Sequence, residues 1–144
     1  MNSFDFTNQL GMLPFHYNAK VIEVTDGDTI IAEVDMGFYT KITQKFRIYQ
    51  DDDSIYFDTP EIRKYKGVTE AHKEHGLEAK ARAEELLLNK NVILHTYKEG
   101  SFRWLAEVYY PVTKMDSHGI PTWYSYVETM INEGFQKKAD YTGE

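Results

Sequence analysis

The hydrophobic pattern of the chain is strand-like from Lys20 onward. β-Branched residues cluster at Val21–Val24 and again at Thr29–Val34, with Asp-Gly-Asp at positions 26–28 between them. An Asp-Gly pair between two such runs is a strong hairpin signal, because glycine accepts the positive φ that a tight turn requires. A second turn at Met36-Gly37 precedes another strand-like run, Thr40–Tyr49. The pattern therefore predicts an antiparallel meander of three strands.

One helical stripe separates this meander from two further strands. Apolar residues recur at i, i+4, i+7 and i+8, which places them on one helix face; they are Ala79, Ala83, Leu86 and Leu87. We predict a helix over 76–89, after a polar loop at 62–75.

The remaining pattern predicts strands at 92–97 and 104–110, then a loop at Pro111 and from Asp116 to Pro121. A short helix is expected over 124–134, with Gly134 as its C-terminal stop.

The order of elements is thus strands, helix, strands, helix, which is typical of an α+β fold that is mainly β. Five antiparallel strands with one helix between the third and the fourth are also the arrangement of an OB-fold barrel. A chain of 144 residues has the length of a single domain. We place an N-terminal arm at residues 1–18, the domain at 19–141 and a tail at 142–144.

Composition limits the chemistry that this domain can perform. The chain has no cysteine, which excludes disulfides and cysteine-based zinc, iron–sulfur and thiol chemistry. Its net charge is −7, so a polyanion would have to be met by a local basic patch or a bound cation. Leu86–Leu88 is the longest aliphatic run, far short of a membrane span, and the N-terminus lacks the features of a signal peptide. We expect a cytoplasmic protein with no membrane partner.

Charged residues that could carry chemistry follow the predicted strands. They are Asp26, Asp28, Arg47, the segment Asp58-Thr59-Pro60-Glu61, and Arg103. Each has a simple structural explanation on its own, since aspartates in turns bond the local backbone and Thr-Pro commonly starts a helix. Their combination in this order is more specific than any one of them.

The ordered set of motifs resembles the staphylococcal nuclease-like (thermonuclease) family. The motifs are Asp-Gly-Asp-Thr at 26–29, Phe-Arg at 46–47, Asp-Thr-Pro-Glu at 58–61 and Arg-Trp-Leu-Ala at 103–106. The resemblance covers roughly residues 18–141 and includes a helix after the third motif. It implies an OB-fold barrel and Ca²⁺-dependent hydrolysis of phosphodiester bonds in DNA and RNA.

The resemblance implies a metal site. Asp28 and Asp58 resemble the carboxylates that hold Ca²⁺, the Thr59 backbone carbonyl resembles the third protein ligand, and Asp26 resembles a supporting carboxylate. Ca²⁺ takes oxygen ligands at flexible geometry, so two carboxylates and a carbonyl leave room for water and a phosphate oxygen.

The resemblance also implies catalytic and substrate-binding residues. Glu61 resembles the general base or the residue that orients the attacking water, and Arg47 and Arg103 resemble two phosphate-contacting arginines. A planar guanidinium matches phosphoryl oxygens bidentately, which a lysine does not. Tyr141 falls near a tyrosine that stacks on a nucleotide; a surface tyrosine is the alternative.

The chain departs from the family pattern in two places. Extra residues between Arg47 and Asp58 include Asp51–Asp53; this acidic triplet forms a solvated loop, adds a second cation site, or repels substrate. Gly100 and Ser101 stand where the family usually has a tyrosine and a basic residue.

His72 and His75 fit no zinc-protease spacing, and we interpret them as polar loop residues.

Two other functions stay open beside the calcium-dependent nuclease. A non-catalytic OB-fold module would bind single-stranded nucleic acid or a protein, and a phosphodiesterase would take short oligonucleotides. For the nuclease we expect single-stranded or locally melted DNA or RNA as partner, and an origin on a phage or other mobile element would suit a cytoplasmic nuclease.

Overall fold

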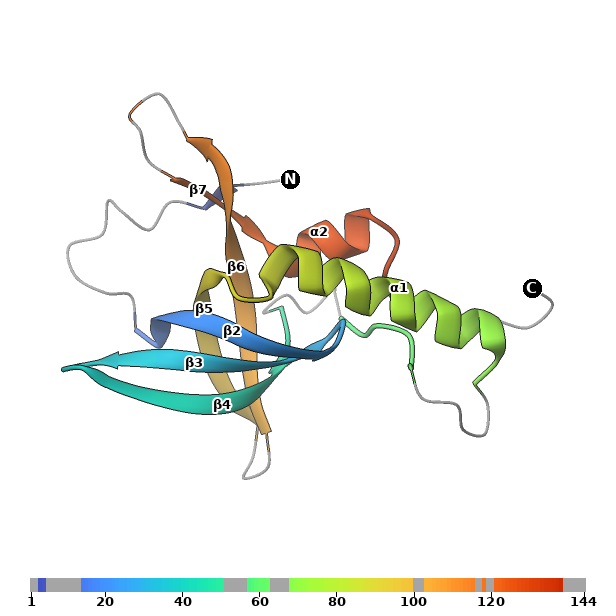
Figure 1. Cartoon of the computed structure of the whole chain (residues 1–144), viewed down its shortest axis with the longest axis horizontal. Coiled ribbons are helices and arrows are strands. Elements are labelled where there is room, and N and C mark those ends of the chain that lie inside the picture. The colour runs from blue at the N-terminus through green and yellow to red at the C-terminus, as the bar shows by residue number, and fades with distance from the viewer. Residues whose placement is uncertain are drawn as a thin grey trace.

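The computed structural model of the chain describes residues 3–4, 14–50, 57–62, 68–99, 103–115, 118 and 121–138. Its strands are β1 (Ser3–Phe4), β2 (His16–Asp26), β3 (Thr29–Gly37), β4 (Thr40–Ile48), β5 (Asn91–Glu99), β6 (Arg103–Met115) and β7 (Pro121–Ser125). Its helices are α1 (Glu70–Leu87) and α2 (Tyr126–Asn132) (Figure 1). None of the helices in these ranges combines the length and the apolar composition that a membrane crossing needs.

Five of the strands close into a barrel. The hydrogen-bonded order is β1-β7-β6-β4-β3-β2-β5, and β5 also pairs with β6. The predicted five-stranded barrel with two helices is therefore confirmed, but it is mixed rather than wholly antiparallel, since β4 and β6 run parallel with Arg47 opposite Leu105. A ring with an odd number of strands cannot alternate direction throughout, so closure requires at least one parallel pair.

The barrel core follows the alternation that the sequence shows. On β3, Ile30, Ala32 and Val34 are buried, and their neighbours on the other face are partly exposed. The predicted apolar stripe of α1 is confirmed, because Ala79, Ala83, Leu86 and Leu87 are all buried; α1 packs against β2.

Helix α1 begins at Glu70, six residues before the predicted start at Gly76. Thr69 is its N-cap, and the Thr69 side chain accepts a hydrogen bond from the His72 backbone N–H at 3.1 Å. Part of the predicted polar loop at 62–75 is therefore helical. A glycine inside a helix is unfavourable, and Gly76 is retained there because another segment passes very close to it, as described below.

The chain after β5 also differs from the prediction. Strand β6 continues through Pro111, where a loop was expected, to Met115 and pairs with β7. Proline is tolerated in β6 because the pairing with β5 ends at Tyr109, so that no ladder bond is lost on that side. Ser125 ends β7 and caps α2 by accepting a hydrogen bond from the Glu128 backbone N–H, so α2 is shorter than expected.

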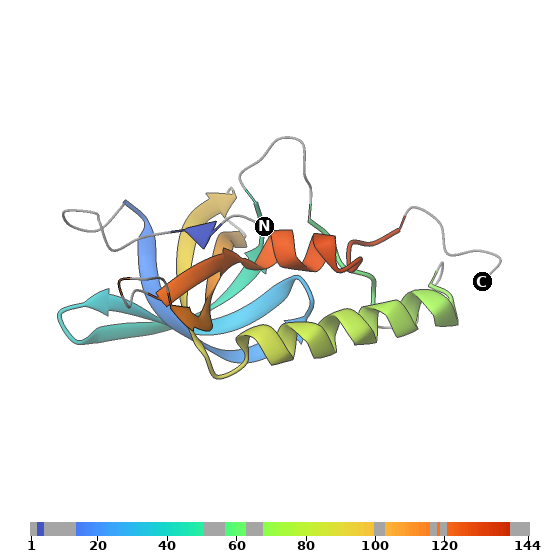
Figure 2. The ribbon, with the colours of Figure 1, turned by 90° about the horizontal axis from the view of Figure 1, so that it is seen from above.

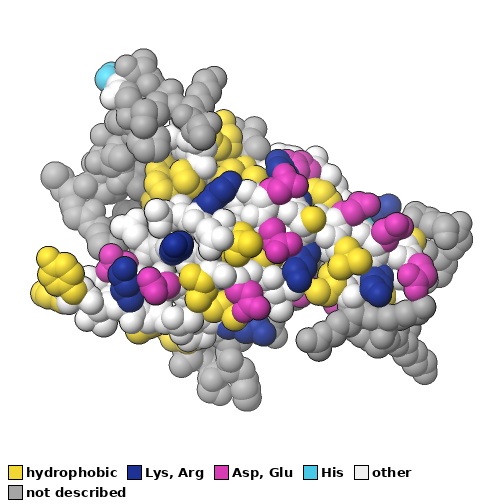
Figure 3. Space-filling view, viewed as in Figure 1, with side chains coloured by type: hydrophobic (Ala, Val, Ile, Leu, Met, Phe, Trp, Pro, Cys, Tyr) yellow, Lys and Arg dark blue, Asp and Glu magenta, His cyan; other side chains and the backbone are white. Residues whose placement is uncertain are grey.

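The two helices lie beside each other along one side of the barrel (Figure 2). Arg82 of α1 joins them through a bidentate ion pair with Glu133 at the end of α2, with N–O distances of 2.7 and 2.9 Å. At the opposite end, the β3–β4 hairpin projects from the barrel (Figure 1). Phe38 and Tyr39 form its fully exposed tip with positive φ, and apolar side chains gather there (Figure 3).

Candidate functional site

The turn between β2 and β3 is built for close packing. The Asp28 backbone N–H donates to Asp26 Oδ1 at 3.1 Å, and the buried Tyr126 hydroxyl donates to the Gly27 carbonyl at 2.5 Å. A Cβ at Gly27 would lie only 2.7 Å from Thr59 Cγ2. The hairpin is confirmed, but the positive φ expected of Gly27 is not found; the turn needs glycine because the 57–62 segment lies directly against it.

Arg47 joins this turn to the segment that follows β4. Its guanidinium lies 2.6 Å from Asp28 Oδ2 and 3.2 Å from Asp58 Oδ1. It also donates to the backbone carbonyls of Asp28 and Phe57, at 3.3 and 3.0 Å. The Arg47 guanidinium thus contacts both predicted carboxylate ligands of the metal. The contacts lie at the end of the barrel where β2 and β4 end and β3 begins.

Asp28 is the centre of these contacts. Besides Arg47, its Oδ2 accepts from the Thr59 backbone N–H at 3.0 Å, and its Oδ1 accepts from the Thr29 hydroxyl at 3.0 Å. Its carbonyl accepts from the Ile48 N–H at 2.7 Å. The candidate ligands Asp28, Asp58 and Thr59 therefore come from two stretches of chain, and Arg47 and Ile48 of a third stretch hold the two together.

The carboxylates of this cluster carry more negative charge than Arg47 balances. Burial, together with the adjoining Asp28 carboxylate, raises the pKa of Asp26 to about 7, and the same causes raise the pKa of Asp58. Burial opposes ionisation of Asp28 as well, but hydrogen bonding with Asp26, the Arg47 charge and the Thr59 N–H lower its pKa to about 2. Raised carboxyl pKa values mark a place where a further cation would be stabilised.

The donor set fits a hard, oxygen-preferring cation such as Ca²⁺. Asp28 and Asp58 would offer carboxylates to such an ion, and Thr59 would offer its backbone carbonyl. The hydroxyl of Thr59 is buried and has no hydrogen-bond partner among the described residues, so the site contains a polar atom whose bonding is incomplete. No group of three His, Asp or Glu side chains within the described ranges is placed to hold a metal ion, so the protein donors would be two carboxylates and a carbonyl.

Glu61 lies on the same segment but has different partners. Its Oε1 is 3.2 Å from the Lys137 Nζ, and its backbone N–H donates to His72 Nε2 at 2.9 Å. A Cβ at Gly76 would lie 2.5 Å from the Glu61 carbonyl oxygen, which explains the glycine inside α1. The predicted general base is thus held between α1 and the chain that follows α2.

The other predicted residues are placed only in part. The backbone of Arg103 begins β6, two positions before the residue that pairs with Arg47. Tyr141 and the Asp51–Asp53 insertion lie outside the described residues. Their roles stay predictions.

The structure adds residues that the sequence analysis did not assign to the site. Tyr126 supports the Gly27 carbonyl, His72 binds the Glu61 amide, and Gln136 and Lys137 contact the 58–61 segment. The interpretation of His72 and His75 as polar loop residues is wrong, because both lie in α1. His75 instead has its Nε2 at 2.8 Å from the Gly134 carbonyl.

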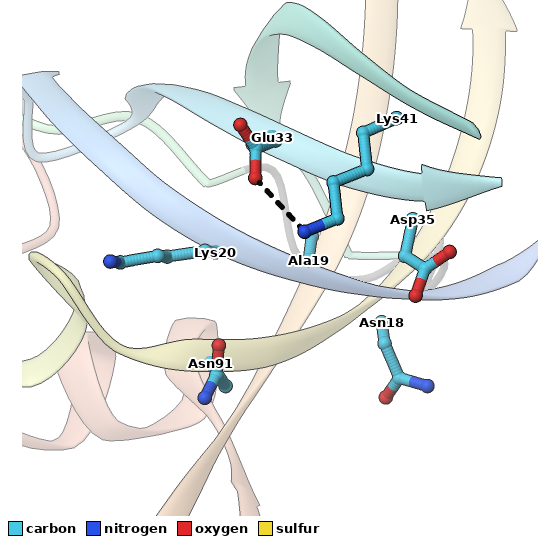
Figure 4. A pocket seen from close by; sticks show the side chains of 7 residues that line it. All are labelled: Asn18, Ala19, Lys20, Glu33, Asp35, Lys41 and Asn91. Carbon is cyan, nitrogen blue, oxygen red and sulfur yellow. Dashed lines mark ion pairs between the residues drawn. The ribbon is translucent and has the colours of Figure 1, made fainter. Parts of the chain in front are cut away.

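A pocket of about 370 Å³ lies away from this cluster, on the outer face of β2 and β3 (Figure 4). Charges of both signs line it; Glu33 pairs with Lys41 at 3.6 Å, beside Lys20 and Asp35. None of the candidate catalytic residues contributes to this pocket.

No protein-family model matches the chain, and no curated protein sequence matches it.

Proposed function

We propose that the protein is a Ca²⁺-dependent nuclease that hydrolyses phosphodiester bonds of DNA or RNA. The observation that carries this proposal is the convergence of Asp28, Arg47 and Asp58 at one barrel end. Hydrolysis of a phosphodiester needs both kinds of group found here. The carboxylate oxygens can bind a cation, and the guanidinium can bind the charged phosphate oxygens.

The residues of the chain have distinct roles in this proposal. Asp28, Asp58 and the Thr59 carbonyl would hold the cation, which when bound would polarise the phosphate. The Arg47 guanidinium already contacts Asp28 and Asp58. Some of its N–H groups would donate to the phosphoryl oxygens as the negative charge on those oxygens increases during the reaction. Glu61 would accept a proton from the attacking water, and Arg103 would supply the second guanidinium.

Charge distribution favours a small or single-stranded substrate. On the face shown in Figure 3, the described acidic and basic side chains are interspersed along α1, and the net charge is −7. Such a surface offers little long-range attraction for duplex DNA, whereas a local site needs only one phosphate. We therefore expect single-stranded or locally melted DNA or RNA, with short oligonucleotides as an extension of this class. Action in the cytoplasm and a phage or mobile-element origin remain predictions.

The test is cleavage of single-stranded DNA and RNA of graded lengths with Ca²⁺ at the order of millimolar, against the same reaction in EDTA. We expect cleavage that requires Ca²⁺ and falls about a hundred- to a thousandfold in Arg103→Ala, and that is also lost in Glu61→Gln. Lys45→Ala, which removes an exposed charge on β4, should cleave at the wild-type rate. Cleavage that persists in EDTA, or that Glu61→Gln leaves unchanged, would contradict the proposal.

A second candidate function is supported by an apolar groove at the mouth of the barrel. The groove holds about 160 Å³ and is lined by Tyr17, Phe46 and the half-exposed Trp104, among others. Aromatic side chains in an OB-fold groove stack on unpaired bases, so this groove favours a non-catalytic module for single strands. Binding of single-stranded DNA in EDTA, weakened in Trp104→Ala without any cleavage by the wild type, would support the second function over the first.

A further inference from the structure

The segment that carries the candidate ligands and base is enclosed by two other parts of the chain. On one side, α1 provides His72 for the Glu61 amide and passes so closely at Gly76 that no side chain fits there. On the other side lies the chain that follows α2. The second contact has no role in the proposed function described so far.

The end of α2 directs this chain toward the segment. Gly134 adopts a positive φ of 86°, and the Phe135 N–H donates to the Met130 carbonyl at 2.9 Å, a helix-ending arrangement that favours glycine. Two backbone contacts then fix the position of Asp58. Its N–H donates to Gln136 Oε1 at 3.1 Å, and its carbonyl accepts from the Lys137 N–H at 2.7 Å.

Lys137 is thereby held beside the site by its own backbone, and its side chain reaches Glu61 Oε1 at 3.2 Å. Both side chains are about one-third exposed, at 34% and 33%, and an ion pair in that setting stabilises a fold little. The pair nevertheless restricts the carboxylate, because one Glu61 oxygen is occupied and Oε2 accepts no hydrogen bond from the described residues.

We propose that Lys137 is a positioning residue of the nuclease site, which orients Glu61 so that Oε2 faces the attacking water. This inference rests on the proposed function and deepens it. Lys137 acts through Glu61 and does not itself touch the reacting atoms. It makes the chain after α2 a part of the site, although its sequence contains none of the motifs that identified the rest.

Lys137 also places a positive charge near Asp58, one of the two candidate cation ligands. Like charges repel, so the lysine weakens Ca²⁺ binding while it assists the reaction. Its removal should move these two quantities in opposite directions. Damage to the fold would lower both, which makes the pair of measurements diagnostic.

The experiment compares Lys137→Met and Lys137→Arg with wild type, and uses Lys138→Met as a control that removes the same charge from the next position. Ca²⁺ affinity is measured by calorimetry, and kcat and KM are measured separately on an oligonucleotide. We expect Lys137→Met to lower kcat about ten- to a hundredfold, the size of a positioning loss, with little change in KM. It should bind Ca²⁺ about two- to fivefold more tightly, as expected for partly exposed charges. Lys137→Arg should keep most of the wild-type kcat.

Two results would overturn the inference. One is a Lys137→Met variant in which kcat and Ca²⁺ affinity fall together, and the other is a loss of kcat no larger than that of Lys138→Met. If the wild type shows no cleavage at all, the proposed function is wrong, and a double-mutant cycle in EDTA decides the contact separately. In that cycle the free energy of unfolding is measured for Lys137→Met, Glu61→Gln and the pair. A small but measurable coupling, the size expected of a partly exposed ion pair, supports Lys137 as the residue that orients Glu61, and a coupling of zero overturns that role.

Discussion

The Arg47 guanidinium lies 2.6 Å from the Asp28 carboxylate, and the two side chains are only 14% and 10% exposed. Their contact joins the β2–β3 turn to the end of β4 and, through Asp58, to the segment that follows. Because water has little access to these charges, loss of one partner leaves the other without compensation. The same pair therefore links the stability of the fold to the candidate site.

Replacement of Arg47 by methionine should destabilise the metal-free protein strongly. Two carboxylates, those of Asp28 and Asp58, would lose their cation, and we expect a cost of about 3 kcal/mol. Urea unfolding in EDTA measures it. Arg82→Met, which breaks the more exposed pair with Glu133, should cost less than about 1 kcal/mol. Equal costs for the two variants would contradict the special position of Arg47.

The stability of the metal-free protein should fall as the pH rises from about 4 to 7. The pKa of Asp26 is raised from 3.8 to about 7 in the folded state, so the folded protein binds more protons than the unfolded chain over this interval. That contribution is fully present below the unfolded pKa and is lost as the pH passes the folded pKa. Chemical unfolding in EDTA at several pH values should show the full loss in wild type and in Asp35→Asn, and a smaller loss in Asp26→Asn, where only Asp58 keeps a raised pKa. A pH dependence that Asp26→Asn leaves intact would assign it to another group.

Two buried tyrosines allow an effect on the candidate metal site to be separated from an effect on the stability of the fold. Tyr126 donates to the Gly27 carbonyl, and the Tyr110 hydroxyl bonds to the Thr129 hydroxyl at 2.8 Å. Tyr126→Phe should cost about 1–3 kcal/mol, because it removes the buried donor to the Gly27 carbonyl. Tyr110→Phe should cost about 1 kcal/mol, because the Thr129 hydroxyl keeps its hydrogen bond to the Ser125 carbonyl. Only Tyr126→Phe should also weaken Ca²⁺ binding, since the Gly27 turn carries Asp28. Calorimetric titration separates them; equal affinities would show that the turn does not depend on Tyr126.

Gly76→Ala tests how closely α1 lies against the segment that carries Glu61. Helix propensity alone predicts a gain of about 1 kcal/mol from glycine to alanine. We expect the opposite sign, because the new Cβ would lie 2.5 Å from the Glu61 carbonyl oxygen and 2.6 Å from that of Pro60. Thermal unfolding measures the change. Ala81→Gly on the exposed face of α1 should show the ordinary propensity cost of about 1 kcal/mol, and a stabilised Gly76→Ala variant would contradict the close contact.

Local pattern determined much of the architecture. The alternation along β3, the Asp-Gly turn and the apolar stripe of α1 depend on neighbouring residues, so a single sequence was enough to predict them. The start of α1 was missed because Gly76 resembled a boundary, whereas its glycine serves a contact with Glu61, which is distant in the sequence. The extension of β6 to Met115 was missed because Pro111 interrupts the pattern at a position where β6 has lost its β5 neighbour, and β7, which pairs with that extension, was missed with it.

The candidate site divides in the same way. Asp26, Asp28, Arg47, Asp58 and Glu61 were predicted from the sequence, because chemically active residues in a fixed order are visible without coordinates. Only the tertiary structure brought Asp28, Arg47 and Asp58 into contact and added Tyr126, His72 and Lys137, whose residue types are common and whose positions are remote. The physical reason is that chain closure decides which distant backbones meet: the parallel pairing of β4 with β6 and the turn after α2 place these side chains at one barrel end, and neither is encoded in any local pattern.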